Sequence, residues 1–148
     1  MSSPVVAPRR TAIPVRLCRS PRQLAAHHAV RRAVFVDELE MFAADDRDDR
    51  DGMASTLHAI GIAEGRVAGA VRLYPLRGGD WKGERLAVLP AARHGSLGAH
   101  LVRFAVATAG VRGGSRMVAM IQLPNIAFFE SLGWRRDGAV VAFHGRPH

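Results

Sequence analysis

The sequence predicts an α/β fold around one mixed central sheet, with strands and helices in the order βαβββαβαβ. Two stretches with helical spacing of apolar residues, at 21–36 and about 96–109, alternate with apolar runs of strand length. The second stretch lies between two strand-like runs, so its helix can bridge two neighbouring parallel strands. We expect about six to seven strands and about four helices.

The first strand and helix are predicted by local signals. Residues 15–19 alternate between apolar and other side chains, which favours a strand. Ser20 can cap a helix that has Pro21 at its first position and Gln23 as a capping partner. The helical spacing then continues through 36.

The rest of the chain supplies a hairpin and then alternates between strand and helix. Two apolar runs at 57–63 and 67–74 flank a short glycine turn, which predicts an antiparallel hairpin. The later elements are expected as a fourth strand from Trp81, a helix through Ala109, a fifth strand at 116–121, a short helix at 124–132 and a last hairpin within 134–144.

At 148 residues the chain has the length of a single domain, which we place at 13–148 behind a flexible basic tail at 1–12. No apolar run approaches the roughly 20 residues that cross a bilayer, and the first residues do not form a signal peptide. The single cysteine, Cys18, excludes an internal disulfide and fits a reducing compartment. We therefore expect a cytoplasmic protein with no membrane partner.

The net charge of +8 makes nucleic acid a candidate partner, but the charge is unevenly distributed. Eight of the 13 acidic residues lie at 37–51, and the remainder of the chain is strongly basic. Aromatic residues make up 6% of the chain and do not interleave with the arginines, so a base-stacking platform is not supported. Nucleic acid is therefore the less favoured partner.

The acidic run at 45–51 has competing interpretations. A solvated loop is the usual outcome for such a run. The alternative is that its carboxylates, with Asp37 and Glu38, line an entrance for a cationic acceptor. A calcium loop is rejected because the closing Glu of an EF-hand is missing. His144 and His148 are four residues apart, but Gly145 and Pro147 would break a helix that aligned them, so no metal site is assigned.

One stretch organises the chain, an apolar strand end followed by a glycine-bearing turn and a helix. The run 86–89 is stopped by Pro90, and the turn that follows contains Arg93, Gly95 and Gly98. Glycines let the backbone approach an anion closely, and the unpaired N–H groups of a helix start attract negative charge. The pattern indicates a phosphate ligand, with a purely steric turn as the alternative.

This stretch resembles the acetyl-CoA-binding segment of the GNAT N-acetyltransferase superfamily. The strand end at 86–90 matches the family pattern. Three later residues fall in register, namely Arg93, Leu97 and Gly98. Ser96 stands where the family has its middle glycine, with Gly95 one position early, and Ser is accepted at a helix N-cap.

A second segment extends the resemblance, which covers about 15–144 in all. The matching residues are Gln122, Asn125, Phe128, Phe129, Gly133 and Trp134. Gln122 replaces an Asn that usually contacts CoA, and it can form similar hydrogen bonds. Phe129 replaces a Tyr whose hydroxyl protonates the departing CoA in the family, so this general acid is missing.

The resemblance implies a GNAT-like central sheet and acetyl-CoA as the cofactor. Backbone groups of 86–88 would pair with the pantetheine arm, and an N–H near Val88 would face the thioester carbonyl. Backbone N–H groups of 94–99 would hold the pyrophosphate. The implied cofactor contacts are Leu86, Ala87, Val88, Arg93, His94, Gly95, Ser96, Leu97, Gly98, Ala99, Gln122, Asn125, Phe128 and Phe129.

The general base has two main candidates. Glu84 opens the fourth strand, where several GNAT enzymes place a catalytic Glu, and its alternative role is to pair with an arginine. His58 enters the second strand and can serve as a base or as a hydrogen-bonded structural histidine. Tyr74 can supply the missing proton if it points inward. Without any donor, a thiol of pKa near ~8.5 can still leave as its anion.

Closer resemblances concern the acceptor side. The chain looks like small bacterial acetyltransferases, including those of nitrogen-starvation gene clusters. It also shares Trp81 and other residues with acyl-homoserine-lactone synthases, but has Met41 in place of their tryptophan and Lys82 in place of their Glu. The residues expected to bind the acceptor are Arg31, Phe35, Glu38 and Arg72.

The sequence thus predicts an acyl-CoA-dependent N-acetyltransferase that acts on a small-molecule amine by direct transfer. An acyl-homoserine-lactone-synthase-like acyltransferase and a basic nucleic-acid-binding module are the alternatives. The identity of the acceptor, the preferred acyl chain and a homodimeric assembly are left open.

Overall fold

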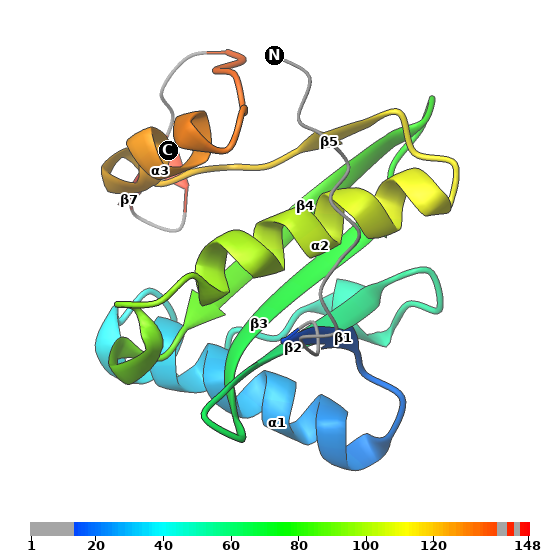
Figure 1. The fold of residues 1–148 in the computed structure, drawn as a ribbon. Helices are drawn as coiled ribbons and strands as arrows, with labels where there is room; N and C mark the ends of the chain where they lie inside the picture. Colours follow the sequence, from blue (N-terminus) through cyan, green and yellow to red (C-terminus); the bar gives the residue numbers. More distant parts are fainter. Residues whose placement is uncertain (1–13, 139–141, 144–145) are drawn as a thin grey trace.

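Five strands form one mixed sheet in the computed structural model, which describes residues 14–138, 142–143 and 146–148. The strands lie side by side in chain order (Figure 1). They are β1 Val15–Leu17, β2 Leu57–Ala63, β3 Arg66–Pro75, β4 Asp80–Val88 and β5 Arg116–Val118. Neighbouring strands are antiparallel except β4 and β5, whose parallel pairing confirms the prediction.

The β2–β3 hairpin forms where the apolar runs predicted it. Its turn holds Glu64 at φ 51° and Gly65 at φ 75°, so both turn residues adopt the left-handed conformation. Two such residues match the twist of the strands they connect. The hairpin therefore fixes the central pair of strands by local sequence alone.

The first helix starts as predicted and continues beyond its predicted end as a π-helix. Ser20 Oγ accepts a hydrogen bond of 3.1 Å from the backbone N–H of Gln23 and caps α1 Pro21–Arg31. The chain then runs on as the π-helical segment η1 Arg32–Glu38 instead of ending at 36. The Leu39 N–H bonds the carbonyl of Val34, five residues back, at 2.9 Å.

The long helix α2 Leu97–Val111 packs on one face of the sheet (Figure 1). Two glycines permit its close approach. A Cβ at Gly69 would lie 2.6 Å from Leu101 Cδ1, and one at Gly61 would lie 2.9 Å from Leu97 Cδ1. This face holds the larger apolar core, which includes Val71, Leu73, Trp81, Leu97, Leu101, Ala105 and Ala109.

The α1 and η1 segments cover the opposite face. Ala70 on β3 packs with Val30, Val34 and Phe35, whereas the next residue, Val71, packs in the α2 core. Successive side chains of a strand point to opposite faces, so the two helical layers sandwich the sheet. The two helices that the sequence predicted therefore lie on opposite faces of the sheet.

The C-terminal part departs from the predicted details. The fifth strand ends at Val118 rather than 121, and a 3₁₀ turn η4 Leu123–Asn125 leads into the short helix α3 Ile126–Ser131. The last two strands, β6 Ala142–Phe143 and β7 Arg146–Pro147, form a separate two-stranded sheet instead of extending the central one. Within the described residues the chain thus has seven strands, three α-helices and the π-helical η1, besides 3₁₀ turns.

Two sequence expectations need separate mention. The tail expected at 1–12 lies outside the described residues, as do parts of the predicted last hairpin. Every helix in the part of the chain that the structure describes is too short or too polar to cross a membrane.

Candidate functional site

The sheet has a gap between β4 and β5. The two strands pair over only three residue pairs, from Asp80↔Arg116 to Lys82↔Val118, and then diverge. A cavity of about 120 Å³ lies beyond the last pair. Its walls come from Lys82 to Leu86 on β4 and from 119–122 after β5, as well as from η1 and α2. The cavity therefore reaches both faces of the sheet.

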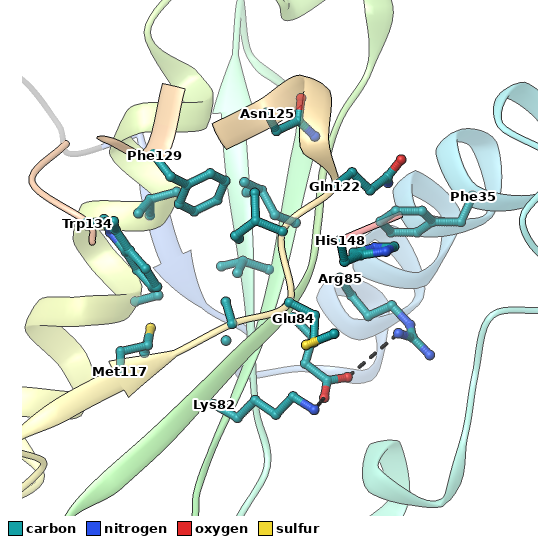
Figure 2. Close-up of a pocket in the computed structure, with 18 of the residues that line it drawn as sticks. Phe35, Lys82, Glu84, Arg85, Met117, Gln122, Asn125, Phe129, Trp134 and His148 are labelled. Atoms are coloured by element: carbon teal, nitrogen blue, oxygen red, sulfur yellow. Dashed lines mark ion pairs between the residues drawn. The ribbon is translucent and has the colours of Figure 1, made fainter. Parts of the chain in front are cut away.

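A β-bulge in β4 opens this gap. The pairing with β3 passes from Ala70↔Ala87 to Arg72↔Glu84, so three residue steps on β4 oppose two on β3. Arg85 occupies the bulge with φ 55°, a left-handed conformation that is uncommon for residues other than glycine. The bulge bends β4 away from β5, and Glu84 and Arg85 line the cavity it opens (Figure 2).

The start of α2 lies against the end of β4. A Cβ at Gly98 would lie 3.6 Å from Phe128 Cζ and 3.8 Å from Val88 Cγ2, so a larger side chain there would fill the space between the three segments. Ser96 is the N-cap residue, but its side chain makes no capping hydrogen bond. The first backbone N–H groups of α2 have no intrahelical partner and can hold an anion beside Gly98.

Arg93 connects this region to η1. Its Nε donates to the carbonyl oxygen of Val88 at 2.9 Å, and its two Nη atoms pair with the carboxylate of Glu38. The hydrogen bonds from Arg93 lower the pKa of Glu38. Arg93, predicted to contact the cofactor, and Glu38, predicted to contact the acceptor, thus bind each other.

The α1 face of the sheet contains a buried network of charges. Arg31 is fully buried, and its guanidinium donates to Asp46 Oδ2 at 2.7 Å and to Asp51 Oδ1 at 2.7 Å. Arg72 is also fully buried and donates to Asp48 at 2.6 Å, to Asp51 at 3.1 Å and to Glu84. The network spans α1, β3, β4 and the acidic run.

This network corrects both interpretations of the acidic run. Asp46 is 1% exposed, so the run is not a solvated loop throughout. Asp46 and Asp51 bind buried arginines instead of lining an open entrance for a cation. Arg31 on α1 and Arg72 on β3 are both buried and would remain uncompensated without these carboxylates, which explains why the run folds back onto the domain.

Glu84 is the carboxylate that belongs to both the network and the cavity. It accepts hydrogen bonds from Arg72 and from the Tyr74 hydroxyl, and Lys82 Nζ lies 3.3 Å from it. Burial alone would raise the pKa of Glu84, but the bonds from Tyr74 and Arg72 outweigh burial and lower it. Burial and the bond to Glu84 raise the pKa of Tyr74 to about 12. Glu84 is therefore an anion at neutral pH.

His58 lies away from the main cavity. Its Nε2 donates to Asp51 Oδ1 at 2.9 Å, and its side chain lines a separate hollow near the start of α1. The potential ligand atoms of His28, Asp51 and His58 lie within 4.8 Å of one another. However, the Asp51 carboxylate already accepts from two arginines and from His58, and a metal cation would have to displace them. We assign no metal to this cluster.

A comparison with protein families decides the identity of the domain. The model of the acetyltransferase (GNAT) family matches residues 23–134. The chain belongs to the GNAT family. It is accordingly an acyl-CoA-dependent N-acyltransferase, and the matched range includes the bulge, the start of α2 and α3.

Solved structures agree with this assignment. A putative N-acetyltransferase from Lactobacillus plantarum has 25% identity and a TM-score of 0.79, with 90% of this chain and 91% of that one covered. An acyl-CoA N-acyltransferase from Pseudomonas aeruginosa has 20% identity and a TM-score of 0.78, with 90% and 94% covered. ElaA from Escherichia coli has 20% identity and a TM-score of 0.77, with 90% of this chain and 95% of that one covered. No curated protein matches the sequence.

Six of the 21 predicted site residues line the cavity. They are Phe35, Glu84, Leu86, Gln122, Asn125 and Phe129. Arg31 and Arg72 lie behind it in the charge network, and Ala87 is buried on the α1 face. Further cavity residues were not selected from the sequence, among them Lys82, Arg85, Val102, Ala105, Met117 and Trp134. Trp134 stands at the end of the second family-like segment, so that pattern could have identified it.

Proposed function

We propose that this GNAT enzyme transfers an acetyl group from acetyl-CoA directly to the amine of a small molecule. One observation carries the proposal. The gap between β4 and β5 has the anion-binding start of α2 near one end of the β4 segment and the ionised Glu84 near the other. A donor and an acceptor can therefore meet within the gap from opposite faces of the sheet.

The residues around the gap fit an acyl-CoA. Among the residues that the structure describes, none pairs as a strand with the β4 edge at 86–88 on the β5 side, so this edge can pair with an extended amide-containing arm. Gly98 keeps the space beside Val88 and Phe128 free for a diphosphate at the α2 start. Acetyl-CoA would supply an acyl group activated as a thioester.

Glu84 and its partners would serve the acceptor. Because Glu84 is ionised, it attracts a protonated amine and can accept the amine proton through a water molecule. Its lowered pKa makes it a weaker base than an ordinary carboxylate. The amine nitrogen forms a bond to the acyl carbon as the thioester C–S bond breaks, and the amine proton passes through water to Glu84. His58 is the less favoured base because it lines another hollow.

The leaving thiol needs no dedicated acid in this proposal. Phe129 lines the cavity but has no hydroxyl. The Tyr74 hydroxyl donates to Glu84, so it supports that carboxylate more directly than it could serve the thiol. A thiol with a pKa near about 8.5 can depart as its anion, which then takes a proton from solvent.

The test measures CoA release from acetyl-CoA with a panel of small amines. Glu84→Gln should lower kcat by about 10²-fold or more while acetyl-CoA affinity, measured by calorimetry, stays within about twofold. Glu130→Gln removes an exposed carboxylate on α3 that pairs with Arg136, and it serves as the control. Equal kcat values for wild type and Glu84→Gln would refute the role of Glu84.

A second experiment addresses the competing acyltransferase chemistry. The enzyme is supplied with an acyl-CoA and S-adenosylmethionine together. Release of methylthioadenosine would favour the acyl-homoserine-lactone-synthase-like alternative, and its absence with amine-dependent CoA release would favour the simple acetyltransferase. A cytoplasmic location without a nucleic-acid partner is part of the same proposal, since both substrates are small metabolites.

A further inference from the structure

The cavity does not end where the predicted acetyl position lies. It continues toward α2, where six apolar or small residues line it, namely Gly83, Val102, Ala105, Met117, Phe129 and Trp134. Figure 2 shows Met117, Phe129 and Trp134 gathered on one side of the cavity, and Arg85, Gln122 and His148 on the other. The cavity is therefore divided into an apolar part and a polar part.

We infer that the apolar part binds the acyl chain of donors longer than acetyl, so that the enzyme uses medium-chain acyl-CoA. This inference rests on the proposed function, because it places the thioester in the gap beside Glu84. It concerns the donor specificity of that site and assigns the six residues above to an acyl-chain pocket.

The position of the pocket along β4 separates it from the path of the CoA arm. The α2 start lies against Val88, so the arm would run from Val88 toward Leu86, which places the thioester past Leu86 rather than near Val88 as the family pattern implied. Gly83 lies three residues beyond Leu86, and the bulge at Arg85 makes this distance shorter than the roughly 10 Å of an extended strand. A chain that reaches Gly83 must therefore extend past the thioester carbon rather than belong to the arm.

Small residues create the room at this end. Gly83 faces Met117, and a Cβ there would lie 3.1 Å from the Met117 sulfur. Ala105 on α2 is 1% exposed and lines the cavity with a single methyl group. Met117 already packs closely over Gly83, so the free room at this end lies beside Ala105. A larger residue at 105 would occupy it directly, and a side chain at 83 would push the end of Met117 toward it.

The walls are also shielded from water. Val102 and Phe129 are 4% and 9% exposed, and the charged residues that line the cavity lie on β4 rather than on α2. Burial of an apolar chain in such a pocket is favourable in proportion to the methylene groups it removes from water. A free acetyl group would leave this volume unfilled.

The first experiment is calorimetric titration of the full chain with CoA, acetyl-CoA, butyryl-CoA and hexanoyl-CoA, without an acceptor. Affinity should rise by up to about fourfold for each added methylene until the pocket is filled. If hexanoyl-CoA binds no more tightly than acetyl-CoA, the inference is overturned while the proposed function stands. If neither CoA nor acetyl-CoA binds, the proposed function fails and this inference fails with it.

Variants localise the effect. Ala105→Leu should reduce the ratio of hexanoyl-CoA to acetyl-CoA affinity by at least about tenfold, because the added atoms fill the pocket. Val106→Leu adds a methylene on the same helix at a position that is 43% exposed, and it should leave that ratio unchanged. An unchanged ratio in a folded Ala105→Leu protein would refute the assignment.

Gly83→Ala provides a second variant should Ala105→Leu fail to fold. Its Cβ meets only the flexible end of Met117, which can move, so the fold should tolerate it. We expect a smaller decrease in the same affinity ratio. A ratio equal to that of the wild type would count against an acyl chain at Gly83.

Discussion

The two faces of the central sheet are built in opposite ways. Under α2 the contact is apolar, with Leu101 fully buried against the glycines and aliphatic residues of β2 and β3. Under α1 and η1, β3 presents Arg72 and β4 presents Glu84, and both side chains belong to the network of buried charges. One sheet thus separates a face with apolar contacts from a face with ionic contacts.

This difference has physical consequences. Apolar burial is insensitive to pH and salt and depends mainly on area and packing. A buried ion network depends on every partner, because removal of one leaves another charge uncompensated in a medium of low polarity. The α1 face should therefore respond to charge substitutions and to pH, and the α2 face should respond to changes in volume.

The largest loss of stability should follow from removing Arg72, which lies at the centre of the charge network. Arg72→Met keeps a long side chain but leaves Asp48, Asp51 and Glu84 with fewer partners. We expect a loss of about 3–5 kcal/mol in the free energy of unfolding, measured by guanidinium denaturation. A loss below about 1 kcal/mol would mean that the network contributes no more than a surface pair.

The control for this variant is an ion pair on the surface. Arg116 pairs with Asp80 at 2.8 Å, but its side chain is 58% exposed. Arg116→Met should change the free energy of unfolding far less than Arg72→Met does, because solvent screens the pair.

The next largest loss of stability should follow from creating a cavity on the apolar face. Leu101→Ala removes a fully buried side chain from the contact with Gly69 and should cost about 3 kcal/mol. The cost should be the same at pH 7 and pH 5, since no titratable group is involved. Val106→Ala, at a position 43% exposed on the same helix, should change stability by no more than about 0.5 kcal/mol. A strongly pH-dependent cost for Leu101→Ala would contradict the separation of the two faces.

The pH response of the α1 face should be visible through His27. Its Nδ1 donates to the Ala59 carbonyl at 2.8 Å, and burial lowers its pKa from 6.5 to about 3. As the pH falls below 6.5, His27 binds a proton in the unfolded chain but stays neutral in the folded chain down to about pH 3. The free energy of unfolding therefore falls as the pH falls. The slope approaches about 1.4 kcal/mol per pH unit for one histidine.

His27→Gln tests this slope, because the amide keeps polar atoms at the position and does not titrate. Denaturation between pH 7 and pH 5 should show a shallower decline in the variant than in the wild type. The burial-lowered pKa of His28, about 4, leaves a residual slope in both proteins. Parallel curves for the two proteins would show that His27 does not stay neutral on folding.

Much of the fold was predictable because its signals are local. The turn at Gly65, the cap at Ser20 and the apolar runs of β2 and β3 each determine an element within a few residues. The separate pairing of β6 and β7 was not predictable, since it depends on β5 ending early beside a strand that has bent away. Strand ends set by such distant partners leave no mark in their own sequence.

The candidate site was also predictable only where its signals are local. The glycine turn before α2 predicted a cofactor segment, and the structure places Gly98 close to Val88 and Phe128. The partners of Arg31 could not be predicted, since Asp46 and Asp51 reach it through a loop whose composition is that of an exposed segment. The bulge at Arg85 was equally hidden, because a residue other than glycine occupies its left-handed position.

The smallest predicted effect concerns Glu38 and Arg93, an exposed pair that connects η1 to the end of β4 and lies outside the buried network. Glu38→Gln should lower the free energy of unfolding by no more than about 1 kcal/mol. It should also tighten CoA binding by up to about fivefold at low salt, because Arg93 then carries an uncompensated charge near the α2 start. The gain should shrink as salt screens that charge.

Glu40→Gln removes a carboxylate from the same segment without touching Arg93, so it corrects for the change in net charge. Calorimetry of both variants at two salt concentrations separates the local effect from the general one. If CoA binds more weakly to Glu38→Gln than to wild type, Arg93 acts by holding the end of β4 in place through Val88 rather than through its charge. That result would give the Glu38–Arg93 pair a structural role, and CoA binding at this end would then depend on the backbone N–H groups of the α2 start alone.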